Sequence, residues 1–285
     1  MLYEKISGFS DEIAEDIDVQ FSTLNKLGIN YFEPRGVNGK NIATLNDEEV
    51  LQLKEKMKEY GIKASSIGSP VGKIKITEDF APHFEQFKRV VRTAKMLDCK
   101  YIRMFSFFKD GEWTDEKVNE VMNRLSKFIE YAKEQGVVLL HENEGDIYGE
   151  TIEGNLNIMQ RFYCDNFRMV FDPANFAQKG IDTIEAIKVL IPYVEYMHIK
   201  DHKNGVGIVP AGMGDGNIKY VMERLFEKGY NGFFSLEPHL GYFKGLADLE
   251  LDGKSKMNGE ASEDTFALAS NSFEKILYEV LSCKK

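Results

Sequence analysis

Four residues of metal-binding type each end an apolar, strand-like run between residues 137 and 237. The runs are Val137–Glu142, Arg168–Asp172, Val194–His198 and Phe233–Glu237. Each gap between neighbouring runs can hold one helix and two loops, so the runs suit parallel strands whose carboxyl ends meet on one face. Three carboxylates and one imidazole form a hard, mostly oxygen donor set. The spacing therefore predicts one metal site built from Glu142, Asp172, His198 and Glu237.

Each of the four residues also has a simpler interpretation. A single Asp or Glu at a strand end is more often a helix cap or half of an ion pair, and His198 alone could be a core histidine. The four together are harder to explain in this way, because an unpaired buried carboxylate is costly and a metal supplies the compensating charge. We expect one divalent ion, with Mn²⁺ as the first expectation and Mg²⁺, Co²⁺ or Zn²⁺ as alternatives.

The whole chain alternates short β-rich runs with longer amphipathic stretches. Strand runs come first at Tyr3–Ser7, Tyr31–Glu33, Lys63–Ile67 and Tyr101–Phe105, ahead of the four runs above. Helices are expected at about Ile13–Leu27, Asp47–Tyr60, Pro82–Leu97, Asp115–Gln135, Thr151–Arg161, Thr183–Leu190, Ile218–Lys228 and Ser262–Leu281. Eight strand–helix units in order favour a closed α/β fold, the (β/α)₈ TIM barrel, over an open doubly wound sheet. We expect one such domain over residues 1–285.

Composition and charge narrow the class of protein. The net charge of −10 argues against nucleic acid as a partner, because such binding depends largely on Lys and Arg neutralising phosphates. The three cysteines, Cys99, Cys164 and Cys283, form no CxxC motif, and an odd number argues against a disulfide framework. No apolar run suggests a signal peptide or a membrane span. These features predict a cytoplasmic protein, and a homo-oligomer is left open because no interface signal is visible.

Five motifs carry a family resemblance. They are HENEGDIYGET (141–151), FDPANF (171–176), MHIKDH (197–202), VPAGMGDGNI (209–218) and SLEPHL (235–240). The chain resembles the sugar phosphate isomerase/epimerase family of the xylose isomerase-like TIM-barrel superfamily, with its tagatose-3-epimerase, inosose dehydratase and endonuclease IV branches. The resemblance covers essentially the whole chain, from GFSDE (8–12) to the last helix.

The resemblance implies a small-molecule carbohydrate substrate and the same four metal ligands. It also implies that Glu142 and Glu237 are catalytic acid/base groups on opposite faces of the bound sugar. One glutamate would remove a proton from carbon and the other would return one, through a metal-stabilised enediolate. This chemistry would make the protein an isomerase or epimerase of a sugar, sugar acid, cyclitol or sugar phosphate.

The chain departs from the epimerase branch three residues after Asp172. That branch usually has a histidine there, whereas this chain has Asn175, which can bind a substrate oxygen but cannot carry a proton at neutral pH. Lys200 follows His198 by two residues and so points to the same side of the strand. It could bind a hydroxyl, carboxylate or phosphate, act as an acid, or be a solvated charge. Both residues keep open a carbon–oxygen lyase of the inosose dehydratase type.

Other candidates for substrate binding rest on position alone. Arg103 lies inside the fourth strand run and could bind substrate or form a structural ion pair. Glu144 is in phase with Glu142 and could support it, and His202 could contact substrate from its loop. Trp113, in the loop Lys109–Thr114, could close over a sugar face or could simply pack.

Four further features are weaker signals. Glu33 and Arg35 end the second strand run, where Arg35 could clamp substrate oxygens or pair with Glu33 or Asp11. Phe9 could pack on a sugar. The glycine-rich loop VPAGMGDG could cradle a phosphate with its amides or could be a flexible turn. The long loop Pro238–Asp264 could be a lid, and the sequence does not decide this.

Two other functions fit less well. An endonuclease-IV-like repair enzyme uses a zinc cluster and needs many histidines, whereas this chain has five histidines and a net charge of −10. A sugar-binding protein that kept the barrel but lost catalysis is the alternative outside enzymes. The complete set of four ligands argues against it, although a metal site alone does not prove turnover.

Overall fold

The computed structural model describes residues 3–244 and 259–282 and has the predicted barrel architecture. Eight parallel strands form its wall. They are β1 (Ile6–Gly8), β2 (Tyr31–Phe32), β5 (Lys63–Ala64), β6 (Tyr101–Met104), β7 (Val138–Glu142), β8 (Phe167–Phe171), β9 (Val194–Ile199) and β12 (Phe233–Leu236). Six of them pair continuously in the order β1-β12-β9-β8-β7-β6, and β2 pairs with β5.

Backbone hydrogen bonds close the ring between these two groups of strands. The amide of Glu33 donates to the carbonyl of Gly8 at 2.8 Å, which joins β2 to β1. The amide of Ile67, just beyond β5, donates to Tyr101, and the amide of Arg103 donates back to Ile67, both at 2.9 Å. The predicted closed (β/α)₈ barrel is therefore confirmed.

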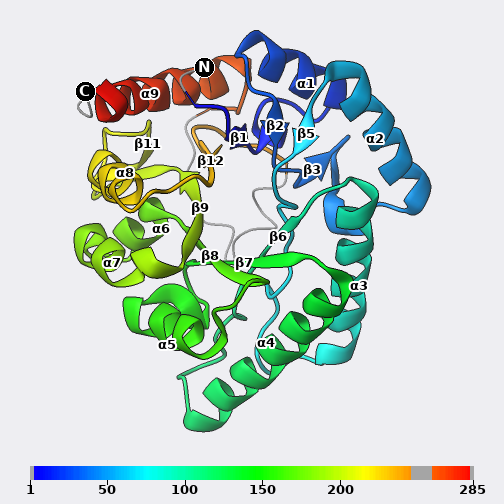
Figure 1. Ribbon diagram of the computed structural model, residues 1–285, viewed down its shortest axis with the longest axis vertical. Coiled ribbons are helices and arrows are strands. Elements are labelled where there is room, and N and C mark those ends of the chain that lie inside the picture. Colours follow the sequence, from blue (N-terminus) through cyan, green and yellow to red (C-terminus); the bar gives the residue numbers. More distant parts are fainter. Residues whose placement is uncertain (1–2, 245–258, 283–285) are drawn as a thin grey trace.

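Helices surround the strands (Figure 1). They are α1 (Ile17–Lys26), α2 (Asp47–Tyr60), α3 (Phe80–Met96), α4 (Asp115–Gln135), α5 (Ile152–Phe162), α7 (Thr183–Leu190), α8 (Ile218–Glu227) and α9 (Glu263–Ser282). The bounds of α2, α4 and α7 match the prediction because strong end signals set them. Asn46 and Glu49 form a capping box at the start of α2, and Gly61 ends the helix at φ +68°.

The first helix begins four residues later than its apolar pattern predicted, at Ile17 instead of Ile13. The carboxylate of Asp16 accepts hydrogen bonds from the amides of Asp18 and Val19 and so caps the helix at that point. The preceding residues form the 3₁₀ turn η1 (Ser10–Glu12). This turn brings Glu12 back to the carboxyl end of the barrel.

Several short elements were not predicted, because they are too short to show a period. They are the hairpin β3 (Gly36–Val37) and β4 (Lys40–Asn41), the helix α6 (Pro173–Gln178), the hairpin β10 (Asp201–Lys203) and β11 (Gly207–Val209), and the 3₁₀ turns η2 (Ile42–Thr44), η3 (Tyr148–Glu150) and η4 (Ile191–Tyr193). Both hairpins and α6 follow barrel strands, so they lie in the loops that build the sites of such barrels.

Alternation along the strands creates two cores. Val138, Leu140, Val170 and Tyr196 pack together inside the barrel, while their neighbours Leu139, Met169 and Met197 join the larger core beneath the helices. Two residues beyond Leu140, Val170 and Tyr196 stand Glu142, Asp172 and His198. The sheet therefore places these three side chains inward, at the carboxyl end of the barrel.

Three sequence-based expectations concern the rest of the chain. Cys99 and Cys164 are unpaired, and Cys283 lies outside the described residues. The loop Pro238–Asp264, considered above as a lid, consists largely of residues 245–258, which also lie outside the described residues. Among the helices of residues 3–244 and 259–282, none is long and apolar enough to cross a membrane.

Candidate metal centre

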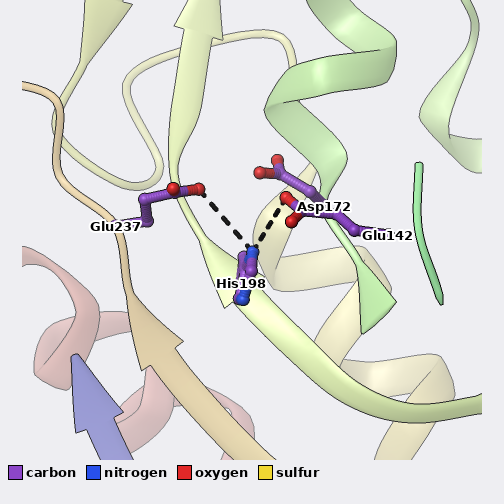
Figure 2. A group of neighbouring side chains, drawn as sticks. All are labelled: Glu142, Asp172, His198 and Glu237. Carbon is purple, nitrogen blue, oxygen red and sulfur yellow. Dashed lines mark hydrogen bonds and ion pairs between the residues drawn. The ribbon is translucent and has the colours of Figure 1, made fainter. Parts of the chain in front are cut away.

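Glu142, Asp172, His198 and Glu237 converge at the carboxyl ends of β7, β8, β9 and β12 (Figure 2). All four side chains are buried, and each offers a ligand atom within 4.8 Å of the others. The structure thus brings together the four residues that the strand spacing selected.

The two nitrogens of His198 face different groups. Its Nδ1 lies 3.0 Å from Oε1 of Glu142 and 3.6 Å from Oε2 of Glu237, so this nitrogen belongs to the cluster. Its Nε2 lies 3.4 Å from Oε2 of Glu33. Tyr196 donates a 2.9 Å hydrogen bond to the same oxygen of Glu33 and fixes that carboxylate. Glu33 therefore faces the side of the ring that the cluster does not use.

The donor set fits a divalent cation. Three buried carboxylate groups in one cluster repel one another, and a doubly charged ion placed among them would reverse that penalty. Carboxylate oxygens with one imidazole nitrogen suit Mn²⁺, Mg²⁺, Co²⁺ or Zn²⁺, and they do not distinguish among these ions. No cysteine belongs to the described cluster, so a thiolate-dependent metal is not favoured.

Lys200 bridges two of the four residues. Its Nζ lies 2.9 Å from Oδ2 of Asp172 and 2.9 Å from Oε2 of Glu237, and the side chain is 4% exposed. Burial raises the pKa of Asp172 to about 7, although the ammonium of Lys200 acts in the opposite direction. Burial lowers the pKa of Lys200, but Asp172 and Glu237 outweigh it and hold that pKa well above its usual value. The lysine is therefore a buried ammonium in direct contact with the cluster.

The two acid/base candidates share a cationic neighbour. Nη1 of Arg103 lies 3.2 Å from Oε2 of Glu142 and 3.5 Å from Oε1 of Glu237. Nη1 of Arg35 approaches the same Glu237 oxygen at 3.0 Å. Burial tends to raise the pKa of Glu237, but Lys200 and His239 outweigh it and hold that pKa well below its usual value. Glu237 is therefore a carboxylate at neutral pH.

Burial and the neighbouring carboxylates shift the pKa of His198 in opposite directions. Burial lowers its pKa, but Glu142 and Glu33 outweigh burial and raise that pKa to about 10. Binding of a metal ion at Nδ1 would therefore displace a proton from the ring.

Asn175 and Glu144 lie beside the cluster. Nδ2 of Asn175 donates to Oε1 of Glu142 at 3.3 Å and to the carbonyl of Asn143 at 2.9 Å. Asn175 thus orients a candidate metal ligand, and Asp172 positions it by capping α6. Glu144 forms an ion pair with Lys73 at 3.2 Å, and burial, which tends to raise its pKa, is outweighed by Lys73 and Lys200.

Trp113 and His202 are not brought to the four residues by any described contact. Trp113 packs edge-on against Tyr148, with ring centroids 5.3 Å apart, and lines a separate cavity of about 400 Å³. His202 lies on β10 opposite Ile208. Their roles as substrate contacts remain predictions.

Glu12 and His239 also belong to the site, although neither was predicted from the sequence. Nε2 of His239 lies 3.5 Å from Oε1 of Glu12 and 3.5 Å from Oε1 of Glu237. His239 follows Glu237 by two residues, the same spacing that drew attention to Lys200 after His198, so this signal was present. Glu12 gave no comparable signal, because only the turn η1 carries it to the site.

The glycine-rich loop after β9 already holds an anion of this chain. The carboxylate of Asp201 accepts hydrogen bonds of 2.9–3.0 Å from the amides of Gly212, Gly214 and Gly216. A Cβ at Gly214 would stand 2.4 Å from Oδ1 of Asp201, so only glycine fits there. These amides therefore already donate to a carboxylate of this chain. The loop matches neither expectation, since its amides are not free to bind a phosphate and Asp201 holds its backbone.

Several known proteins resemble this chain in sequence or in fold. The inosose dehydratase of Mesomycoplasma hyopneumoniae (strain J) is 23% identical over 237 residues, which cover 71% of this chain and 77% of that protein. The crystal structure of a D-tagatose 3-epimerase-like protein superposes with a TM-score of 0.75 at 16% identity, covering 99% of this chain and 100% of that one. The IOLI protein, solved with a zinc atom, gives a TM-score of 0.75 at 17% identity, with 97% and 99% covered.

The family assignment rests on most of the chain. Residues 21–251, which include all four candidate ligands, match one family over a continuous stretch. With the closed barrel and the buried cluster of three carboxylates and one histidine, this match leads to one conclusion. The chain belongs to the xylose isomerase-like TIM barrel family.

Proposed function

We propose that this protein is a divalent-metal-dependent isomerase or epimerase that moves a proton between carbon atoms, or between faces of one carbon, of a sugar-like ketone. One observation carries the proposal. Two buried glutamates, Glu142 and Glu237, reach the same nitrogen of His198 from different strands, at 3.0 and 3.6 Å. Two carboxylates around one candidate metal position can serve both faces of a substrate bound between them.

The chain's own residues supply the proton transfer. A divalent ion held by the four residues would polarise a substrate carbonyl and stabilise the negative charge that develops on its oxygen. Glu237 is ionised at neutral pH, as a group that accepts a proton from carbon must be. Asn175 and Arg103 hold the two oxygens of Glu142, so this carboxyl group keeps one orientation during the reaction. Arg35 similarly orients Glu237.

A carbon–oxygen lyase is the second candidate, and Lys200 favours it. Its buried ammonium touches both Asp172 and Glu237, so it stands where it could donate a proton to a departing hydroxyl group. The relative named as an inosose dehydratase supports the same outcome. Both candidates begin with removal of a proton from a carbon next to a carbonyl, and they differ in whether water leaves.

Proton exchange in D₂O, followed by NMR, tests the shared first step. The metal-stripped protein is resupplied with Mg²⁺ or Mn²⁺ and mixed with ketoses, inososes, sugar acids and sugar phosphates. The proposal predicts metal-dependent deuterium uptake beside a carbonyl, loss of uptake in Glu237→Gln, and normal uptake in Glu185→Gln, which changes an exposed glutamate of α7. Uptake without loss of water indicates the isomerase or epimerase, and loss of water indicates the lyase. Equal uptake in Glu237→Gln and the unmodified chain would rule out the assigned role.

A further inference from the structure

Two arginines flank Phe9 and approach Glu237 in the same way. The guanidinium carbons of Arg35 and Arg103 lie 4.4 and 4.8 Å from the centre of the Phe9 ring. Each places Nη1 near Oε1 of Glu237, at 3.0 Å for Arg35 and 3.5 Å for Arg103. The two side chains can therefore be compared directly.

The other edge of the Arg35 guanidinium, formed by Nε and Nη2, donates two hydrogen bonds to a carboxylate of this chain. Its Nε lies 2.8 Å from Oδ2 of Asp11, and its Nη2 lies 3.0 Å from Oδ1 of the same residue. Nε–H and Nη2–H point side by side, so they match the two oxygens of one carboxylate. Nε, Nη1 and Nη2 of Arg35 therefore all have hydrogen-bond partners within the chain.

The same edge of Arg103 has no such partner. Neither Nε nor Nη2 of Arg103 has a hydrogen-bond partner within residues 3–244 and 259–282, although the side chain is only 2% exposed. Leaving donors of a buried cation unpaired costs free energy. The guanidinium is nevertheless held in place, because Nη1 binds the two glutamates and the rings of Phe9 and Phe105 pack at 4.8 and 5.0 Å.

We propose that the Nε/Nη2 edge of Arg103 is a substrate subsite that takes a pair of neighbouring acceptor oxygens. This inference rests on the proposed function and names the substrate chemistry that the site selects. Two sources offer such a pair: the carboxylate of a sugar acid, and the adjacent oxygens of a neutral ketose or cyclitol. Asp11 on Arg35 shows how this chain itself satisfies the equivalent edge.

The orientation of the guanidinium says which part of the substrate is held. Nη1 points to Glu142 and Glu237, so the Nε/Nη2 edge lies on the opposite side of the planar group. The oxygens bound there belong to a part of the substrate away from the carbon whose proton moves. Arg103 is therefore a specificity-determining residue, and it positions the reacting carbon through a remote contact.

NMR of the arginine Nε–H groups tests the subsite without turnover. The Mg²⁺-loaded full chain is used, and the signals are assigned from spectra of Arg103→Lys and Arg35→Lys. Sodium acetate and glycerol serve as small probes of the two oxygen-pair chemistries. A matched pair, D-fructuronate and D-fructose, then compares a keto acid with a neutral ketose. We expect the Nε–H of Arg103 to exchange with water about tenfold or more faster than that of Arg35, because the Nε–H of Arg35 donates to the carboxylate of Asp11 and the Nε–H of Arg103 has no acceptor among the described residues.

The outcomes separate the two oxygen sources and the two proposals. A shift of the Arg103 signal with acetate and D-fructuronate alone assigns the subsite to a carboxylate. A shift with glycerol and D-fructose assigns it to neighbouring hydroxyl oxygens. Equal protection of both arginines, with no shift by any probe, would overturn the subsite. Because these signals need no reaction, a responding Arg103 without deuterium uptake would refute only the proposed function.

The stability of the variants is checked separately. Arg124→Lys is the control for loss of a buried arginine, since Arg124 is 6% exposed and pairs with Glu120 on the helix α4, away from the four residues. Arg103→Lys should weaken binding of the responding probe tenfold or more, whereas Arg124→Lys should leave it unchanged. If both variants bound the probe equally weakly, the loss in Arg103→Lys would come from a general structural change. That result would contradict the subsite.

Discussion

Glu33 and His198 face each other across the interior of the barrel, with Oε2 of the glutamate 3.4 Å from Nε2 of the imidazole. Once a metal ion displaces the proton from Nδ1, a carboxylate in this position would keep the remaining proton on Nε2 and leave the lone pair of Nδ1 for the ion. Glu33 is buried and also accepts a hydrogen bond from Tyr196, so its position does not depend on a ligand.

Replacement of Glu33 should therefore weaken metal binding. We expect Glu33→Gln to lower the affinity for a divalent ion by about 10- to 100-fold, as measured by calorimetry. Glu195→Gln is the matched control, because Glu195 also accepts a bond from a tyrosine, Tyr101, but does not contact His198. Unchanged affinity in Glu33→Gln would mean that the imidazole is held by its other neighbours.

Removal of the Lys200 ammonium should destabilise the metal-free chain. The Lys200 ammonium lies 2.9 Å from the carboxylates of Asp172 and of Glu237. Lys200→Met removes this cation and leaves both carboxylates buried. Breaking a buried pair in this way costs about 3–5 kcal/mol, so urea unfolding should show a decrease of that order. Saturating divalent metal should recover much of the loss, because it supplies positive charge to the same oxygens.

A second lysine controls for the general loss of an ion pair. Lys179 pairs with Asp146 and Glu150 and is more exposed, so Lys179→Met should cost about 1 kcal/mol or less, with no recovery by metal. A loss in Lys200→Met that is equally small, or that metal does not change, would contradict the role of Lys200 as a counter-ion.

The glycine-rich loop should depend on Asp201. In Asp201→Ala, the amides of Gly212, Gly214 and Gly216 lose their acceptor, and we expect the free energy of unfolding to fall by about 3 kcal/mol or more. Asp215→Ala, in the same loop, removes a single exposed bond to the amide of Asn204 and should cost less than about 1 kcal/mol. Similar losses in the two variants would show that Asp201 does not hold the loop.

His83 should make the fold sensitive to acid. Its Nε2 accepts a 2.7 Å hydrogen bond from the amide of Gly72, and burial lowers its pKa from 6.5 to about 4. Between these values the unfolded chain binds a proton that the folded chain does not, so stability is present above about pH 6.5 and falls as the pH drops toward 4. The full difference is about 3 kcal/mol.

Urea unfolding at a series of pH values measures this contribution. His83→Gln keeps an acceptor for the Gly72 amide but cannot titrate, so its stability should fall less between pH 6.5 and 4 than that of the unmodified chain. Parallel pH profiles for the two proteins would mean that His83 does not contribute.

Strand-end residues could be predicted from sequence because two simple rules position them. Parallel strands bring their carboxyl ends together, and alternation sends every second side chain inward. These rules were enough for Glu142, Asp172 and His198, which follow Leu140, Val170 and Tyr196 by two positions. The strand pairing confirms the predicted fold and the match over residues 21–251 confirms the family, whereas the catalytic and substrate-binding roles stay predictions.

Loop residues could not be predicted in this way, since their positions depend on local backbone conformations and distant partners. Glu12 reaches Arg35 only because η1 turns the chain, and His239 lies in a left-handed conformation at φ +46°. The partner of the glycine-rich loop is Asp201, which lies well before the loop and is joined to it through the β10–β11 hairpin. The two-residue spacing after Glu237 pointed to His239, but no periodicity in the sequence encodes the contacts of Glu12 or of the glycine-rich loop.

Metal stoichiometry and affinity, measured by calorimetry and elemental analysis, test the central claim most directly. The account predicts one divalent ion per chain, at least about 100-fold weaker binding in Asp172→Asn and His198→Asn, and unchanged binding in Glu185→Asn on the exposed face of α7. Binding that is absent in the unmodified chain, or equal in all of these proteins, would contradict a metal site formed by Glu142, Asp172, His198 and Glu237.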